Sequence, residues 1–70
     1  MYRTKVSSSN LSAVGYNSFQ MILEIEFNDG AVYRYFGVPQ NVYSGLMSAT
    51  SHGKYFHAYI RNNYRYSRVG

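Results

Sequence analysis

Alternating apolar and polar residues from Phe19 to Phe27 predict the clearest β-strand of the chain. One face of this strand would carry Phe19, Met21, Leu23, Ile25 and Phe27. The opposite face would carry Gln20, Glu24 and Glu26, and Ile22 alone breaks the alternation. A weaker alternation over Leu11 to Tyr16 predicts a preceding strand, which we place at an edge of the sheet. Gly15 within it indicates a bend or a close approach to a neighbouring backbone.

The tripeptide Asn28-Asp29-Gly30 predicts a hairpin into a third strand, Ala31 to Phe36. A two-residue turn at Asp29-Gly30 would set Arg34 beside Ile25 on the core face. A three-residue loop with Gly30 in the left-handed region instead pairs Arg34 with Glu24 on the outer face. The two registers exclude one another, because a one-residue slip exchanges the faces of every side chain. We predict the second register.

This register decides what two central tyrosines do. Tyr33 and Tyr35 then point into the core and form the floor on which later elements pack, rather than a binding surface. Sheet-based RNA-binding proteins stack unpaired bases on exposed aromatic side chains. Tyr64 and Tyr66 are therefore the better candidates for stacking on bases.

Two helices are predicted after the third strand. Pro39 would begin the first, because its missing N–H has no helical partner at the first position in any case. One apolar stripe follows, formed by Val42, Tyr43, Leu46 and Met47. Gly45 weakens this helix and indicates a close approach to the sheet. Ser51 would cap a second helix to roughly Asn62, with Phe56, Tyr59 and Ile60 on its apolar face.

The predicted fold class is therefore α+β: a three-stranded antiparallel β-meander followed by two helices packed on one face. Residues 64–70 form either an extra strand or an ordered coil. The whole chain, residues 1–70, makes a single domain. Such a short chain buries only about 60% of its unfolded surface. With no cysteine and nine tyrosines, a dense aromatic core or self-association must supply the remaining stability.

The charge balance predicts the class of partner. Seven Lys and Arg against three Asp and Glu give a net charge of +4, which attracts RNA, DNA or acidic proteins. A basic protein without a dedicated polyanion partner accounts for the same charge. Residues 1–10 lack the apolar run of a signal peptide, and no stretch reaches the ~18 apolar residues of a membrane span. We expect a cytoplasmic protein with no membrane partner.

The second helix offers the strongest candidate surface. Its start presents free backbone N–H groups and a lysine to an anion. A basic stripe continuing into the tail would follow a phosphate backbone. The predicted anion-binding or nucleic-acid-binding residues are Ser51, Gly53, Lys54, His57, Arg61, Tyr64, Arg65, Tyr66 and Arg68. A capped helix with a solvated basic face explains the same residues without a ligand.

The sequence contains no set of residues that indicates a catalytic site or a metal site. Glu24 and Glu26 share a strand face that we expect to be solvated, and His52 and His57 point to different sides of a helix. Ser51 lacks an aspartate to complete a triad, and helix capping accounts for it. With no cysteine and three acidic residues, a metal site is not expected either. We predict no enzyme activity and no cofactor.

A set of short motifs, in order along the chain, resembles the KTSC domain, a family named for its occurrence at the C-terminus of some lysyl-tRNA synthetases. The family also occurs as small single-domain proteins of bacteria and their phages. The motifs are S-S-N-L at 8–11, V-G-Y at 14–16, Tyr33 and Tyr35, F-G-V-P at 36–39, Val42-Tyr43 with Leu46, S-x-G-K-Y-F at 51–56, and Ile60-Arg61. The resemblance spans Ser7 to Arg68. It implies a single-domain protein with a proposed RNA-binding role and no catalytic residues.

Three functional hypotheses follow. The leading one is a non-enzymatic module that binds RNA through the basic second helix and the tail. The second is a nucleotide or phosphorylated small-ligand binder at Ser51 to Lys54. The third is a protein-interaction module that self-associates through tyrosine-rich surface.

Overall fold

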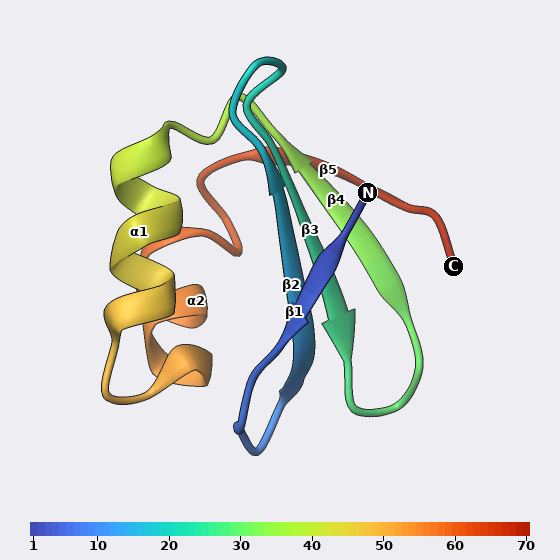
Figure 1. Cartoon of the computed structure of the whole chain (residues 1–70), viewed down its shortest axis with the longest axis vertical. Helices are drawn as coiled ribbons and strands as arrows, with labels where there is room; N and C mark the ends of the chain where they lie inside the picture. Colours follow the sequence, from blue (N-terminus) through green and yellow to red (C-terminus); the bar gives the residue numbers. More distant parts are fainter.

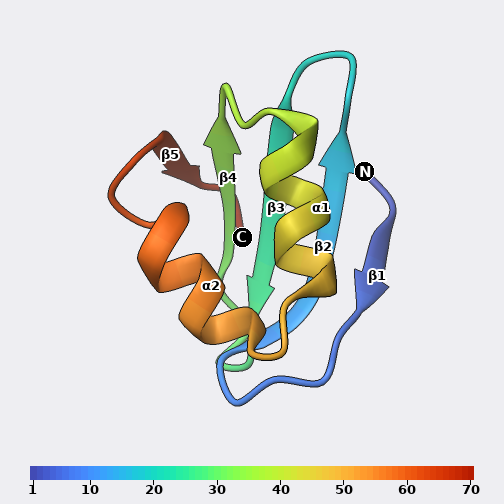
Figure 2. The ribbon, with the colours of Figure 1, turned by 90° about the vertical axis from the view of Figure 1, so that its left-hand side faces the viewer.

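The computed structural model describes all 70 residues as a five-stranded antiparallel sheet with two helices on one face (Figure 1). The elements are β1 (Arg3–Lys5), β2 (Leu11–Asn17), β3 (Ile22–Phe27), β4 (Val32–Phe36), α1 (Gln40–Ser48), α2 (His52–Tyr59) and β5 (Arg65–Arg68). The strand order is β1-β2-β3-β4-β5, so every strand pairs with its neighbour in the sequence. Figure 2 shows α1 in front of β2 and β3, and α2 in front of β4.

The α+β class is confirmed, but three strands are too few. The β1 strand pairs with β2 on one side of the predicted meander, and β5 pairs with β4 on the other. Both additional strands are short edge strands, and neither has a buried side chain, so no alternation marks them in the sequence. Because β1 covers it, β2 is not an edge strand as predicted. The tail forms a strand, one of its two predicted states.

The core lies between the sheet and the helices. Nine buried residues form one cluster: Leu11, Val14, Leu23, Ile25, Tyr35, Val38, Leu46, Phe56 and Ile60. They come from β2, β3, β4, both helices and the segments that flank the helices. Neither helix has the length and apolar character needed to cross a membrane.

The predicted hairpin register between β3 and β4 is confirmed. Leu23 pairs with Tyr35 and Ile25 with Tyr33, while Glu24 pairs with Arg34 on the outer face. The turn is a three-residue loop, because the Phe27 N–H donates to the Ala31 carbonyl at 2.8 Å. Gly30 within the loop has φ +95°, the left-handed conformation that the register requires.

The strand predicted over Phe19 to Phe27 begins only at Ile22. Phe19 is 98% exposed at the tip of the β2–β3 turn, and Met21 is also exposed, so their assignment to the core face was wrong. Met21 has φ +54°, and its carbonyl accepts the Val38 N–H at 2.9 Å. Residues 19–21 therefore belong to the turn. Their apolar alternation is in phase with that of β3, which is why the strand was predicted to start too early.

A β-bulge accounts for the weak alternation in β2. Leu11 pairs with Phe27, whereas Ala13 pairs with Glu26, which leaves one extra residue between them. Past the bulge the alternation shifts by one residue. Leu11 and Val14 therefore both face the core, at 0% and 1% exposure.

The helix boundaries differ from the prediction by a few residues. Pro39 precedes α1 in extended conformation, and its carbonyl accepts the N–H groups of residues 42 and 43. Gly45 makes room for the Tyr55 ring of α2, not for the sheet. Ser51 caps α2 as predicted, because its Oγ accepts the Lys54 N–H at 3.2 Å. The helix ends at Tyr59, which is exposed rather than part of the apolar face.

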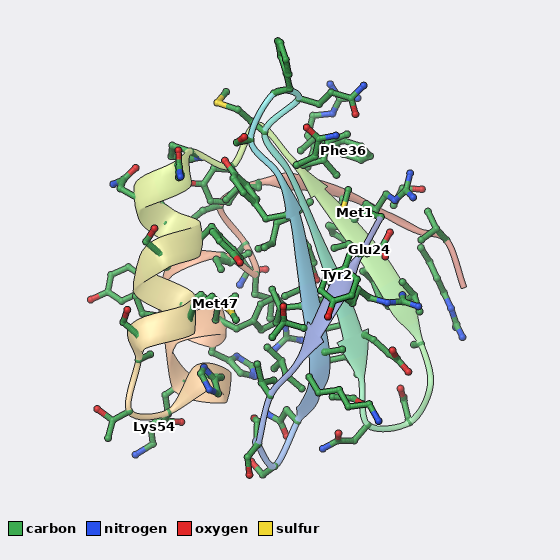
Figure 3. The ribbon with its side chains drawn as sticks, in the orientation of Figure 1. Met1, Tyr2, Glu24, Phe36, Met47 and Lys54 are labelled. Carbon is green, nitrogen blue, oxygen red and sulfur yellow. The ribbon has the colours of Figure 1, made fainter.

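A row of cross-strand neighbours spans the outer face of the sheet: Arg3, Gly15, Glu24 and Arg34. Arg34 Nε donates to Glu24 Oε1 at 2.7 Å, and Arg3 Nη1 lies 3.2 Å from Glu24 Oε2. Figure 3 shows Glu24 near Met1 and Tyr2, on the side of the sheet away from the helices. Glu24 is only 4% exposed, so the prediction that it is solvated was wrong.

Gly15 allows the N-terminal residues to approach β2 closely on this face. A Cβ at this position would stand 2.7 Å from the Tyr2 carbonyl oxygen and 3.1 Å from Arg3 Cγ. The close approach predicted for Gly15 is therefore confirmed, with β1 as the neighbour.

Gly15→Ala is expected to lower the free energy of unfolding by about 1–2 kcal/mol, because backbone rather than a flexible side chain must move. Chemical denaturation measures the loss, and hydrogen exchange of residues 3–5 locates it at β1. Ser12→Ala, at a half-buried position on the same strand, is the matched control. Unchanged stability together with unchanged protection of β1 would contradict the expectation.

Candidate binding groove

An open groove of about 650 Å³ lies between α2 and the β4–β5 side of the sheet. Its walls come from the turn before β2, the β3–β4 loop, β4, α2 with the turn after it, and β5. The lining residues are Ser9, Asn10, Phe27, Asn28, Asp29, Tyr33, Tyr35, Phe56, His57, Arg61, Asn62 and Tyr66. We call this hollow the aromatic groove.

Packed aromatic rings form the floor of the aromatic groove. Tyr66 contacts both Tyr33 and Tyr35, with ring centroids 5.8 and 5.7 Å apart. Phe56 packs its ring edge-on against Tyr35 at 5.4 Å. Tyr35 is buried, whereas Tyr66 remains 60% exposed. The floor is therefore rigid where it joins the core and open at Tyr66, where a flat ligand can stack.

The wall formed by α2 and the turn after it is basic. Arg61 Nη1 lies 3.3 Å from His57 Nδ1, an arrangement in which the guanidinium donates to the unprotonated ring nitrogen. No carboxylate lies within ion-pair distance of either side chain. Burial, and then the neighbouring Tyr33 and Tyr66, raise the pKa of Tyr35 to about 12, while Arg61 lowers it. Arg61 thus acts electrostatically on the floor of the groove and is free to meet an anion.

The structure brings three of the predicted site residues together in the aromatic groove: His57, Arg61 and Tyr66. Arg68 pairs with Tyr33 on the groove side of the sheet, and its Nε donates to the Gly70 carbonyl at 2.8 Å. Arg65 pairs with Phe36 and faces the outer side instead. The stripe expected to run from Arg61 to Arg65 is broken, because the helix ends before both residues.

The remaining predicted residues lie outside the aromatic groove. Ser51 uses its hydroxyl to cap α2. Gly53 is buried against the turn before β2, where a Cβ would stand 3.2 Å from Asn10 Nδ2. Lys54 is exposed at the lower end of the helical layer (Figure 3). Tyr64 packs partly buried against the core. The start of α2 is therefore separate from the aromatic surface.

Several groove residues were not among the predicted binding residues. Asn10, Asp29 and Asn62 carry polar groups of the groove, and Tyr33, predicted only as core, also lines the groove. These residues come from distant segments that only the folded sheet brings together. The asparagines and the aspartate stand in turns, where local backbone needs explain them equally well.

The histidine without a groove position has a structural role. His52 Nδ1 lies 2.8 Å from the Leu46 carbonyl oxygen, so its N–H ties the start of α2 to the last turn of α1. No three His, Cys, Asp or Glu side chains stand close enough together to hold a metal ion.

Comparisons with known proteins place these features in a family. A sequence model of the KTSC domain matches residues 7–64. An uncharacterised protein of Stutzerimonas stutzeri is 43% identical over 70 residues, which cover 99% of each chain. The crystal structure of a KTSC domain protein from Yersinia pestis superposes with a TM-score of 0.96 at 35% identity, covering 99% of this chain and 97% of the other.

A longer relative contains the same unit as a small part. A lysine–tRNA ligase of Trichormus variabilis is 37% identical over 65 residues, and this chain spans only 12% of that protein. The sequence match, the whole-length relative and the shared architecture agree. This chain belongs to the KTSC domain family.

Proposed function

We propose that this protein is a non-enzymatic module that binds RNA, with an unpaired base on the floor of the aromatic groove and a phosphate at Arg61. The observation that carries the proposal is the open aromatic surface of Tyr66 and Tyr33 directly beside an arginine without a carboxylate partner. Stacking of a base on an aromatic ring contributes about 1–3 kcal/mol and tolerates every base.

The distribution of charge supports a polyanionic partner. Only Arg3 and Arg34 form ion pairs with carboxylates, which leaves Lys5, Lys54, Arg61, Arg65 and Arg68 available. Two of these, Arg61 and Arg68, lie at or beside the aromatic groove. Each phosphate that such a cation neutralises releases counterions, so binding should weaken steeply as salt rises.

The longer relatives support RNA as the polyanion. The matching segment of the Trichormus variabilis protein belongs to a lysine–tRNA ligase, an enzyme whose name includes tRNA. A small module that holds RNA would be useful in such an enzyme and as a separate chain.

A comparison of Arg61→Ala with Lys54→Ala tests the proposal. Both variants remove one positive charge, but only Arg61 lines the aromatic groove. We expect Arg61→Ala to weaken the binding of a short single-stranded RNA about tenfold, and Lys54→Ala to weaken it about twofold, as for a distant phosphate contact. Fluorescence anisotropy at low salt measures both dissociation constants. Absence of RNA binding by the unmodified protein would overturn the proposal.

Two variants of Tyr66 test the stacking part of the proposal in the same binding assay. Tyr66→Ala removes the exposed ring and should weaken RNA binding about tenfold, the value of one stacked base. Tyr66→Phe keeps the ring and should bind like the unmodified protein. Equal losses for Arg61→Ala and Lys54→Ala, with no loss for Tyr66→Ala, would move the site from the groove to the charged face of α2.

A nucleotide or another phosphorylated small molecule is the second candidate. Ligand pockets in proteins measure about 300–1,000 Å³, and the aromatic groove falls in this range at about 650 Å³. This candidate predicts a thermal shift with a mononucleotide that single-stranded RNA does not reproduce. The same four variants, with a mononucleotide in place of the RNA, test whether this ligand binds in the aromatic groove.

A further inference from the structure

A single carboxylate, that of Asp29, lines the aromatic groove. Asp29 lies in the β3–β4 loop, and no Lys, Arg or His lies within ion-pair distance of it. Its Oδ1 accepts the Ala31 N–H at 3.0 Å, which holds the side chain in one orientation. Oδ2 has no partner in the chain. A carboxylate at this place repels phosphate, so it marks the part of the groove where a ligand must present hydrogen-bond donors.

The basic and acidic residues of the groove favour different parts of a nucleotide. His57 on α2 and Arg61 in the turn after it attract the phosphate, and the aromatic floor takes the base. Two amides, those of Asn10 and Asn62, also line the groove and make no side-chain hydrogen bond within the chain. An amide can donate to a carbonyl or ring nitrogen of a base and can also accept from it. The lining of the groove therefore includes one fixed acceptor, Asp29, and two amides that can adapt to a ligand.

A carboxylate discriminates among the four bases. It only accepts hydrogen bonds, and it accepts two parallel ones best. Guanine presents N1–H and N2–H side by side on its Watson–Crick edge. Adenine and cytosine present one amino donor beside an acceptor nitrogen, which would face the second carboxylate oxygen. Uracil presents its N3–H between two carbonyl oxygens. Guanine is the one base whose edge offers paired donors without a repulsive neighbour.

We infer that the aromatic groove selects guanine, with the Asp29 carboxylate accepting from N1–H and N2–H while the ring stacks on Tyr66. The inference rests on the proposed function, since it assigns the base that the groove holds. The same chemistry is available from a guanosine within an RNA strand and from a free guanine nucleotide. Asp29 is a specificity-determining residue in both cases.

The experiment compares four 5′-mononucleotides with oligouridine strands that carry one central G, A, C or U. The unmodified protein should bind the G-containing strand about tenfold more tightly than the others, as expected for a bidentate base contact. Asp29→Asn should remove this preference, because the amide turns a donor toward N1–H. The introduced amide keeps an oxygen that can accept the Ala31 N–H, so the loop is preserved. Glu26→Gln is the control, because it removes a negative charge on the outer face.

The outcomes separate the two proposals. If no strand binds but GMP does, and Asp29→Asn abolishes that binding, the guanine inference stands and RNA binding falls. If strands bind without preference for G, or if Asp29→Asn keeps the preference, the guanine inference is overturned while RNA binding stands. If neither strands nor nucleotides bind, both proposals fail.

Discussion

Glu24→Ala is expected to lower the free energy of unfolding by about 3 kcal/mol, since it leaves two arginines facing each other without their shared carboxylate. Arg34 Nε and Arg3 Nη1 both contact this carboxylate, which is 6% exposed. The two arginine side chains are 33% and 39% exposed and keep part of their hydration. For this reason we place the loss at the lower end of the range for a broken buried ion pair.

Glu26 provides the matched control on the same strand and the same face. It makes one ion pair, at 3.7 Å from Arg3, and is 34% exposed. Glu26→Ala should cost at most about 0.5 kcal/mol, as exposed ion pairs do. Glu24→Gln, which keeps the shape and two acceptor positions of the side chain, should fall between the two. Urea denaturation followed by circular dichroism measures all three, and equal losses for Glu24→Ala and Glu26→Ala would refute the expectation.

The outer-face network shows why part of the fold was predictable and part was not. Glu24 and Arg34 lie in strands that the alternation and the hairpin loop place in register, so their pairing follows from the sequence. Arg3 lies in a three-residue strand with no apolar side chain facing the core. Its position depends on backbone pairing with β2 and on the space above Gly15, neither of which leaves a periodic signal. The same reasoning applies to β5, whose four residues are all exposed.

The aromatic groove was predictable only in its separate parts. His57, Arg61 and Tyr66 carry residue types that bind nucleic acid, and they were identified for that reason. Asp29 and Tyr33 complete the groove. Nothing in the sequence assigns them to a binding site, because a hairpin loop explains Asp29 and core packing explains Tyr33. The groove forms because α2 ends at Tyr59 and the chain then turns back to pair β5 with β4. A helix continued to residue 62, as predicted, would have kept Arg61 on the same helical face as Lys54 and Ala58.

The free energy of unfolding is expected to fall at alkaline pH because of Tyr35. Burial and the neighbouring phenols raise the pKa of Tyr35 to about 12 in the fold, whereas an unfolded tyrosine ionises near pH 10. The unfolded chain therefore releases this proton at lower pH than the folded chain does. Below about pH 10 the contribution to stability is fully present, and it is lost progressively as pH rises toward 12. The loss should reach about 2 kcal/mol.

Tyr35→Phe isolates this contribution, because phenylalanine keeps the ring and cannot ionise. The difference in free energy of unfolding between the unmodified protein and Tyr35→Phe should be constant up to about pH 10 and then shift in favour of the variant. Tyr2→Phe is the control, since Tyr2 is exposed. Burial also raises the pKa of Tyr16, so the difference between proteins, not the absolute curve, reports on Tyr35. Parallel curves for Tyr35→Phe and Tyr2→Phe would contradict the expectation.

Arg61 links this titration to the binding groove. Its positive charge lowers the pKa of Tyr35 against the larger effect of burial. Arg61→Ala should therefore move the late step of tyrosinate absorbance at 295 nm to still higher pH, and Lys54→Ala should leave it in place. The late step thus tests whether Arg61 lies against the floor of the aromatic groove and Lys54 lies outside it. An unchanged late step in Arg61→Ala would contradict this placement of Arg61.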